Sequence, residues 1–491
     1  MLKKKNISVA LGPILFFLLE WILPDSIPTP AKATIASIVW VAFWWVTEAV
    51  PIAVTSIMPL LLFPLTGVMD LRATTISYSN PLIFLFLGGF ILALAMEKWN
   101  LHKRIALNII KLVGVKKQQL ILGFIIATGF LSMWISNTAT TVMMLPIALS
   151  IIKQSKRVNA SEAQDIEESR FSKALILSLP YAASIGGMAT LIGTPTNLIL
   201  SDAIKQFYNV EIAFDQWMLI GVPIATLLLF VCWFHLTRIV FKIKNKDTLG
   251  EKNIIQEELN KLGKMQSEEK WVLIVFVIVV LMWITRRFLI TPFFPAVNDT
   301  IIVLIGAVTL FIIPSTSKKE ERLMDWQTAS KLPWGVLLLF GGAFAIASGF
   351  QASELTILIG EQLGSLSGIP FLVILFVVIL VVNFMTEVTL NMAMCTVMMP
   401  ILATLAIALD VHPYGLMIGT CIAASCAFML PVATAPNAVA FGSGAIKVRD
   451  MVNTGFLLNI ISVIVISFAV YFLLPIFWDI DLLQFPIEFK K

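Results

Sequence analysis

The sequence predicts an all-α polytopic membrane protein with about 11 transmembrane helices plus two re-entrant hairpins in an inverted-topology repeat. Three observations predict it: long apolar blocks, basic loops in alternation, and motifs that recur in the same order. Of the 491 residues, 58% are hydrophobic and only 13% are charged, whereas soluble proteins have about a quarter charged. A bilayer core about 30 Å thick requires roughly 20 apolar residues per helix.

The apolar residues come in blocks such as 271–284 and 457–477. Because these blocks lack the alternation of barrel strands, they predict helices. The first block follows the basic stretch "MLKKK", but no small-residue cleavage site comes after it, so we expect a retained helix. The expected spans are residues 8–24, 33–46, 50–67, 82–98, 172–201, 215–241, 271–290, 299–314, 332–350, 411–443 and 453–477.

Two further apolar stretches, 119–152 and 368–403, are too long for one helix, and small polar residues interrupt each near its middle. Lysine and arginine concentrate in alternate loops, as expected for cytoplasmic segments. The alternation holds only if each long stretch enters and leaves on one side, the first from inside and the second from outside. We therefore expect two re-entrant hairpins in a multi-pass plasma-membrane protein with a cytoplasmic N-terminus, and Arg286 and Arg287 are the main exception.

Composition and residue placement argue against several other classes of protein. The four cysteines and three histidines have no metal-site spacing, which argues against a metalloenzyme and against any enzyme. The net charge of +5 is explained by cytoplasmic loops, so no nucleic-acid partner is expected. The loop 242–270 is expected to be a linker with a short amphipathic helix at "NIIQEELNKL".

Three motifs recur in the second half of the chain. "SNTATTVMMLP" (136–146) matches "LNMAMCTVMMP" (390–400), which places Asn137 on Asn391. The double glycine of 84–96 recurs in 336–348, and the Thr-Pro-Thr-Asn of 194–197 matches the Thr-Ala-Pro-Asn of 434–437. Three matches in order indicate a duplication. Since the two halves enter the membrane from opposite sides, the repeat is inverted, which is typical of transporters.

The polar interruptions are the candidate binding elements. Helix N-termini with amide and hydroxyl donors hold anions, and free carbonyl and hydroxyl oxygens hold small cations. Asn137 and Asn391 can do both, and Thr138 adds a hydroxyl. Such residues also act as glue between membrane helices, but their recurrence in both halves favours a site. The intramembrane acids Glu48 and Glu387 are either functional groups or structural anchors.

These motifs resemble those of the divalent anion/sodium symporter family, the INDY-type dicarboxylate transporters. The resemblance rests on "SNTATTVMMLP", "YAASIGGMATLIGTPTNLIL" (181–200) and "ATAPNAVAFGSG" (433–444), and it covers nearly the whole chain. It implies a homodimer in the lipid bilayer, with scaffold and transport domains and an elevator-type motion. The implied substrates are C4-type dicarboxylates such as succinate, malate and fumarate, with 2-oxoglutarate as a further candidate.

The resemblance also implies a domain organisation and site residues. Residues 1–118 and 271–367 would be scaffold helices, 119–241 and 368–491 would hold the transport-domain elements, and 242–270 would link the halves. The implied substrate ligands are Asn137, Thr138, Asn391, Thr194, Pro195 and Pro436. The implied ligands of sodium are Ser132, Ser136, Asn137 and Gly193 at a first site, and Thr386, Thr389, Asn391 and Thr434 at a degenerate second site. Apart from Na⁺, no cofactor is expected.

The chain departs from the family pattern in the second hairpin. Its motif reads Leu390-Asn391-Met392, where the family has Ser-Asn-Thr. Because Leu and Met side chains cannot ligate sodium, this departure favours a dicarboxylate exchanger with weak or no sodium coupling. The alternatives are a sodium-coupled dicarboxylate symporter, or a transporter of another oxyanion such as citrate or sulfate.

Overall fold

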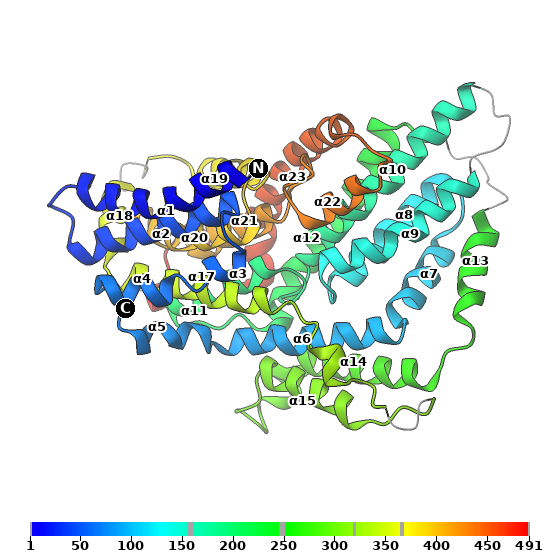
Figure 1. Cartoon of the computed structure of the whole chain (residues 1–491), viewed down its shortest axis with the longest axis horizontal. Helices are drawn as coiled ribbons and strands as arrows, with labels where there is room; N and C mark the ends of the chain where they lie inside the picture. The colour runs from blue at the N-terminus through cyan, green and yellow to red at the C-terminus, as the bar shows by residue number, and fades with distance from the viewer. Residues whose placement is uncertain (1, 156–161, 245–250, 318–320, 364–367, 490–491) are drawn as a thin grey trace.

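The computed structural model describes residues 2–155, 162–244, 251–317, 321–363 and 368–489, and the regular secondary structure in these ranges is helical apart from one isolated bridge between Pro314 and Arg322 (Figure 1). Parts of three predicted basic loops, 156–161, 245–250 and 318–320, lie outside these residues. The helices of the first half are α1 Leu2–Ile22, α2 Thr29–Thr47, α3 Ile52–Thr55, α4 Pro59–Thr66, α5 Leu71–Tyr78, α6 Pro81–Lys98, α7 Leu101–Val113, α8 Lys117–Ser132, α9 Asn137–Ser155, α10 Glu162–Gly187, α11 Pro195–Tyr208 and α12 Phe214–Phe234.

The second half begins after the linker helix α13, Glu251–Leu262. Its helices are α14 Ser267–Thr285, α15 Asp299–Ile312, α16 Trp326–Ala329, α17 Trp334–Ala352, α18 Leu355–Leu363, α19 Phe371–Met385, α20 Asn391–Ala408, α21 Pro413–Ala424, α22 Ala435–Gly442 and α23 Val448–Trp478. Among the described residues, six helices are long and apolar enough to cross a membrane: Leu71–Lys98, Phe214–Val240, Ser267–Ile290, Trp334–Ala352, Asn391–Ala408 and Val448–Trp478. The all-helical membrane fold is thus confirmed, while the count of 11 spans stays a prediction.

Each long interrupted stretch folds as a pair of helices. In the first, α8 and α9 are separated by a short turn before Asn137, and in the second, α19 and α20 are separated by the turn before Asn391. The spans expected at 172–201 and 411–443 are both broken, into α10 and α11 and into α21 and α22. Pro195 and Pro436 lie in the first turns of the helices after these breaks, where a missing N–H costs no hydrogen bond.

Two helical features differ from the predicted spans. The expected single span 50–67 is divided into α3 and α4, and α4 begins at Pro59. Helix α7 buries Leu107 and Ile110 on one face and carries Lys103 and Lys111 along its length. Because an amphipathic helix is apolar on one face only, a search for apolar blocks does not find it.

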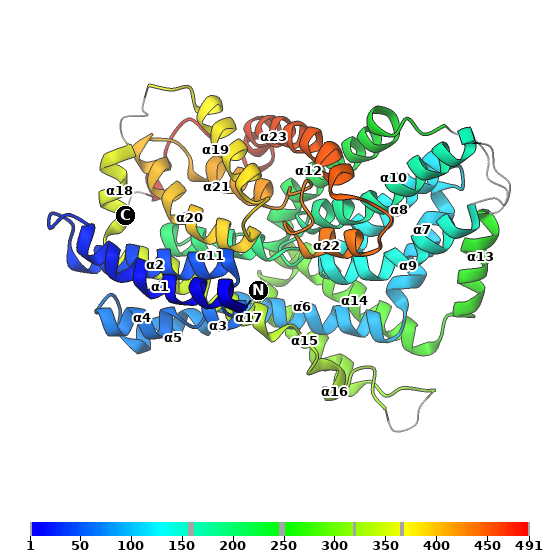
Figure 2. The ribbon, with the colours of Figure 1, turned by 45° about the horizontal axis from the view of Figure 1, so that its top comes forward.

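The two halves interleave around the centre of the molecule. Helix α9 of the first hairpin packs against α22 of the second half, and α20 of the second hairpin packs against α11 of the first. The views in Figures 1 and 2 show these central helices between α1 and α2 at one end and α13 at the other. The four interrupted elements therefore meet in pairs that each combine both halves.

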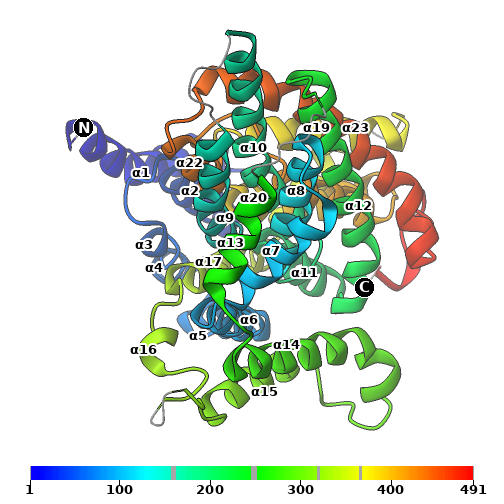
Figure 3. The ribbon, with the colours of Figure 1, turned by 90° about the vertical axis from the view of Figure 1, so that its right-hand side faces the viewer.

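Helix α13 confirms the amphipathic helix predicted in the linker. It packs along α7 and α9 (Figure 3). Lys103 of α7 lies 3.1 Å from the Glu258 carboxylate. Arg104 pairs with Glu269 and donates to the Gly263 carbonyl at 3.0 Å. The linker is thus fastened to the first half and to the start of α14.

The exceptional charges Arg286 and Arg287 are balanced by nearby acids. Arg286 Nε lies 2.7 Å from Asp299 Oδ1, and these side chains are only 12% and 7% exposed. Arg287 lies 3.6 Å from Asp215 and is half-exposed. A paired charge is less costly at a membrane surface than an isolated one, which accounts for the exception to the charge rule.

Replacing Arg286 by alanine is expected to lower the free energy of unfolding by about 2 kcal/mol, because it leaves the buried Asp299 carboxylate unpaired. Arg287→Ala is the matched control, with an expected loss below about 1 kcal/mol because Arg287 is half-exposed and lies 3.6 Å from its partner. Thermal unfolding of both purified variants in detergent measures the difference. Equal losses would show that the burial of the pair has no energetic consequence.

Candidate functional site

The tip of the first hairpin gathers oxygen atoms around the Asn137 amide. The Ser132 hydroxyl lies 2.6 Å from it. The carbonyl oxygens of Ala183 and Gly193 lie 3.2 and 3.3 Å away, at the positions that the amide nitrogen would face. A Cβ on Gly187 would come within 2.5 Å of the amide, so only glycine leaves room there. Three of the four residues predicted for a first ion site, Ser132, Asn137 and Gly193, are therefore in contact.

The second hairpin repeats this arrangement. Thr386 Oγ1 donates to Asn391 Oδ1 at 2.6 Å and to the Ala424 carbonyl at 3.0 Å. Thr386 corresponds to Ser132, and Asn391 to Asn137, at one offset of 254 residues. The same hydroxyl–amide pair, with a carbonyl from the neighbouring helix, thus occurs in both halves although the surrounding tripeptides differ.

The two helix breaks are also built alike. Asn197 donates through its amide to carbonyls of the preceding unwound segment, at 2.7 Å for Thr190 and at 3.4 Å for Gly187. Asn437 donates at 3.0 Å to the carbonyls of Leu430 and Ala427. In each half the acceptors lie seven and ten residues before the asparagine. These two asparagines hold the unwound segments in shape. The motif match identified both positions in the sequence but did not predict this role.

Direct contacts join the breaks of the two halves. The hydroxyls of Thr196 and Ser425 are 3.1 Å apart, and Cys421 Sγ lies 3.2 Å from Asn197 Oδ1. All four side chains are buried. The first turn of α11 therefore lies against the end of α21, and these helices also pack against α20 of the second hairpin.

The other predicted residues lie at helix starts or point elsewhere. Ser136 accepts from the Ala139 amide at the start of α9, and Thr138 is half-buried in the same turn. Thr194 and Thr434 precede α11 and α22 with nearly equal extended backbone angles. Thr389 is half-buried and donates back to the Met385 carbonyl, so its hydroxyl is not brought to Thr386 and Asn391.

Leu390 and Met392 have a packing partner. Both side chains pack against the apolar cluster formed chiefly by α2, α4 and α17, which includes Val41 and Ile346. At the equivalent positions the first hairpin has Ser136 and Thr138. The departure from the family pattern thus coincides with an apolar contact that the second hairpin makes with these helices.

Of the two intramembrane acids, Glu387 is a structural anchor in this conformation. Its carboxylate accepts from the backbone amides of Phe428, Met429 and Leu430 at 2.7–3.1 Å, and from Asn459 Nδ2 at 2.7 Å. It thereby holds the unwound segment between α21 and α22. Glu48 is exposed at the end of α2. Nothing in the sequence around Glu387 indicates these partners, because they lie about 40 and 72 residues away.

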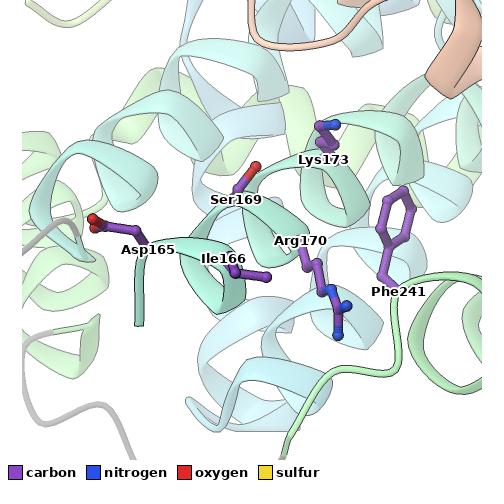
Figure 4. A pocket seen from close by; sticks show the side chains of 6 residues that line it. All are labelled: Asp165, Ile166, Ser169, Arg170, Lys173 and Phe241. Carbon is purple, nitrogen blue, oxygen red and sulfur yellow. The ribbon is translucent and has the colours of Figure 1, made fainter. Parts of the chain in front are cut away.

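A surface groove of about 510 Å³ lies apart from this region (Figure 4). It is lined by Asp165, Ile166, Ser169, Arg170, Lys173 and Phe241. Lys173 precedes Gly187 by 14 residues of α10, which is about 21 Å along a helix. The groove is therefore separate from the hairpin tips, and its Lys173 already pairs with Asp450 at 2.8 Å.

The arrangement at the tips is suited to small ions. The Asn137 amide oxygen faces only acceptors and its nitrogen faces only donors, so turning the amide satisfies both ends and directs the nitrogen at Ser132, Ala183 and Gly193. Unwound carbonyls with hydroxyls are typical sodium ligands, and the free N–H groups at the starts of α9, α11, α20 and α22 are typical anion donors. Cation and anion sites can therefore lie side by side here.

Comparison with known proteins gives one family and one fold. The family model described as "Sodium:sulfate symporter transmembrane region" matches residues 4–479. The sodium-dependent dicarboxylate transporter SdcS of Staphylococcus saprophyticus is 46% identical over 488 residues, covering 99% of this chain and 94% of the relative. The protein of the same name from Staphylococcus aureus strain USA300 is 45% identical with the same coverage.

Two solved transporter structures are similar in fold at low sequence identity. The YdaH transporter of Alcanivorax borkumensis matches with a TM-score of 0.58 at 12% identity, covering 90% of this chain and 98% of that one. The MtrF structure of Neisseria gonorrhoeae matches with a TM-score of 0.59 at 14% identity, covering 93% and 96%. These two matches support the helical transporter fold alone.

Proposed function

Because this chain belongs to the family of sodium:sulfate symporters, we propose that it is a secondary active transporter that carries C4-type dicarboxylates together with sodium. It is a membrane transporter and not an enzyme. The proposed substrates are succinate, malate and fumarate. The names of the relatives at 45–46% identity support both the dicarboxylate and the sodium.

The observation that carries the proposal is the repeated oxygen cluster. One copy consists of Ser132, Asn137 and the Gly193 carbonyl, and the other of Thr386, Asn391 and the Ala424 carbonyl. We assign one sodium ion to each copy. The dicarboxylate would lie between them, with one carboxylate at Asn137 and Thr138 and the other at Asn391, near the helix starts at Thr194, Pro195 and Pro436.

Exchange without sodium is the second candidate, and Leu390 and Met392 favour it because their side chains offer no oxygen. Two facts weigh toward symport. Thr386 and Asn391 keep their side-chain oxygens in contact, and the close relatives are named as sodium-dependent. The homodimer, the elevator motion and the division into scaffold and transport domains belong to the same proposal.

Uptake of radiolabelled succinate into proteoliposomes tests the proposal. We expect an inward sodium gradient to drive uptake into empty vesicles at least about tenfold above a choline control, by analogy with typical coupling energies. Unlabelled malate, fumarate, citrate and sulfate serve as competitors. Uptake that requires internal dicarboxylate and ignores sodium would establish exchange instead, and inhibition by sulfate alone would contradict the dicarboxylate assignment.

A further inference from the structure

Helix α19, the turn that follows it and helix α23 carry four buried polar side chains on facing surfaces. They are Asn383 on α19, Glu387 in the turn of the second hairpin two residues after α19 ends, and Asn459 and Ser462 on α23. Glu387 is 3% exposed and the other three are 0% exposed. Residues three or four apart lie on one face of a helix or helical turn. Each of the two segments therefore presents a pair of polar groups to the other across an otherwise apolar contact.

The register of the two helices brings these pairs together. Asn459 Nδ2 lies 2.7 Å from Glu387 Oε1. The ring centroids of Phe384 and Phe456 are 5.8 Å apart. Farther along, those of Phe371 and Tyr471 are 6.3 Å apart. Residue numbers rise on one helix as they fall on the other, so the helices run antiparallel. Asn383 then lies level with Ser462, one turn from the Glu387–Asn459 contact.

Two amide oxygens in this group lack a donor, and the Ser462 hydroxyl has only a thiol beside it. Asn383 donates from Nδ2 to the Cys426 carbonyl at 2.8 Å, which fixes the orientation of its amide. Asn459 is oriented in the same way by Glu387. The opposite atoms, Asn383 Oδ1 and Asn459 Oδ1, have no hydrogen-bond partner among the described residues, and the Ser462 hydroxyl interacts only with the weakly bonding Cys426 thiol. Each unsatisfied buried acceptor costs about 1–3 kcal/mol.

When Glu387 is ionised, the electrostatic balance of the group is negative. The four donors to Glu387 are neutral backbone and side-chain amides. Among the ion pairs of the described residues, none involves Glu387. Amide donors stabilise the carboxylate without neutralising its charge. Oxygen atoms without donors beside an uncompensated negative charge favour the binding of a cation, and they disfavour an anion.

We propose that a sodium ion binds between α19 and α23, coordinated by the unpaired amide oxygens of Asn383 and Asn459 together with the Ser462 hydroxyl, and balanced by Glu387. This ion is additional to those proposed at Asn137 and Asn391. Its role as a coupled ion rests on the proposed function, whereas its binding does not. Because Glu387 also holds the unwound segment before α22, occupancy of the site would stabilise that segment.

Direct sodium binding to the purified full-length chain tests the site. Bound ²²Na⁺ is counted per protomer in detergent without dicarboxylate. Ser462→Ala and Asn383→Leu are each expected to bind one ion fewer, or that ion at least tenfold more weakly, than the wild type. Ser467→Ala is the matched control, because this buried hydroxyl on the same helix already donates to the Val463 carbonyl at 2.8 Å. Its count should equal that of the wild type.

Equal ²²Na⁺ counts in folded Ser462→Ala and wild type would overturn the proposal and indicate a water molecule instead. A second measurement does not depend on the variants. A structure of the wild type in saturating Tl⁺ should show a density peak between α19 and α23, and absence of the peak would also overturn it. Succinate uptake is measured on the same wild-type preparation, so a protein that binds this ion but carries no dicarboxylate would refute only the proposed function.

Discussion

Asn137→Ala is expected to reduce succinate uptake by about a hundredfold, to the level of empty vesicles. The substitution removes the amide around which Ser132 and the carbonyls of Ala183 and Gly193 are arranged. It removes a proposed hydrogen bond to a carboxylate, which is worth about 1.5–3 kcal/mol, and it leaves the neighbouring oxygens without their partner. Asn391→Ala should have an effect of similar size, because Thr386 and Asn391 form the same contact in the second half.

Succinate binding by titration calorimetry and uptake into proteoliposomes measure the two effects. Asn108→Ala is the control, since this exposed amide on α7 donates only to the Arg104 carbonyl. The control should keep wild-type uptake. Wild-type uptake by Asn137→Ala would remove the first hairpin from the site, and a normal Asn391→Ala would limit the site to one half of the repeat.

Glu387→Leu is expected to lower the free energy of unfolding by about 3–5 kcal/mol. The leucine would leave the amides of Phe428, Met429 and Leu430 and the Asn459 side chain without their shared acceptor. Unpaired buried donors cost about 1–3 kcal/mol each, and this cost is smaller where water enters and accepts their hydrogen bonds. The melting temperature in detergent should therefore fall by many degrees.

The control for this substitution is Glu257→Leu, on the exposed surface of α13. Substitutions at such positions usually stay within about 0.5 kcal/mol of the wild type. A melting temperature of Glu387→Leu equal to that of the control would mean that the segment 428–430 holds its shape without the carboxylate.

The architecture could be predicted because it depends on patterns that are local or repeated. Blocks of apolar residues indicate helices, and the recurrence of Asn137 at Asn391 indicates the duplication. The same recurrence located Asn197 and Asn437, although only the structure shows the carbonyls to which they donate. The hairpins could be predicted because charge alternation excludes a simple crossing.

Other features depend on partners that are distant in sequence. The contacts of Glu387 with Asn459 and with residues 428–430 have no local signature. The amphipathic α7 lacks an apolar block. The pairing of Arg286 with Asp299 requires α14 and α15 to lie side by side. From the sequence, Arg286 and Arg287 could be identified only as an exception to the alternation of basic loops.

The apolar contact of Leu390 and Met392 would affect the relative populations of the two orientations of the empty protein. A molecule made of two related halves could rest equally in two opposite orientations if the halves were energetically alike. Here one hairpin tip has two partly buried apolar side chains where the other has hydroxyls. Burial of this kind contributes about 1–3 kcal/mol, which corresponds to a population ratio of roughly 5 to 150. Most molecules without ligand would then have the second tip docked against α2 and α17. Ions and substrate would therefore bind mainly from one side of the membrane.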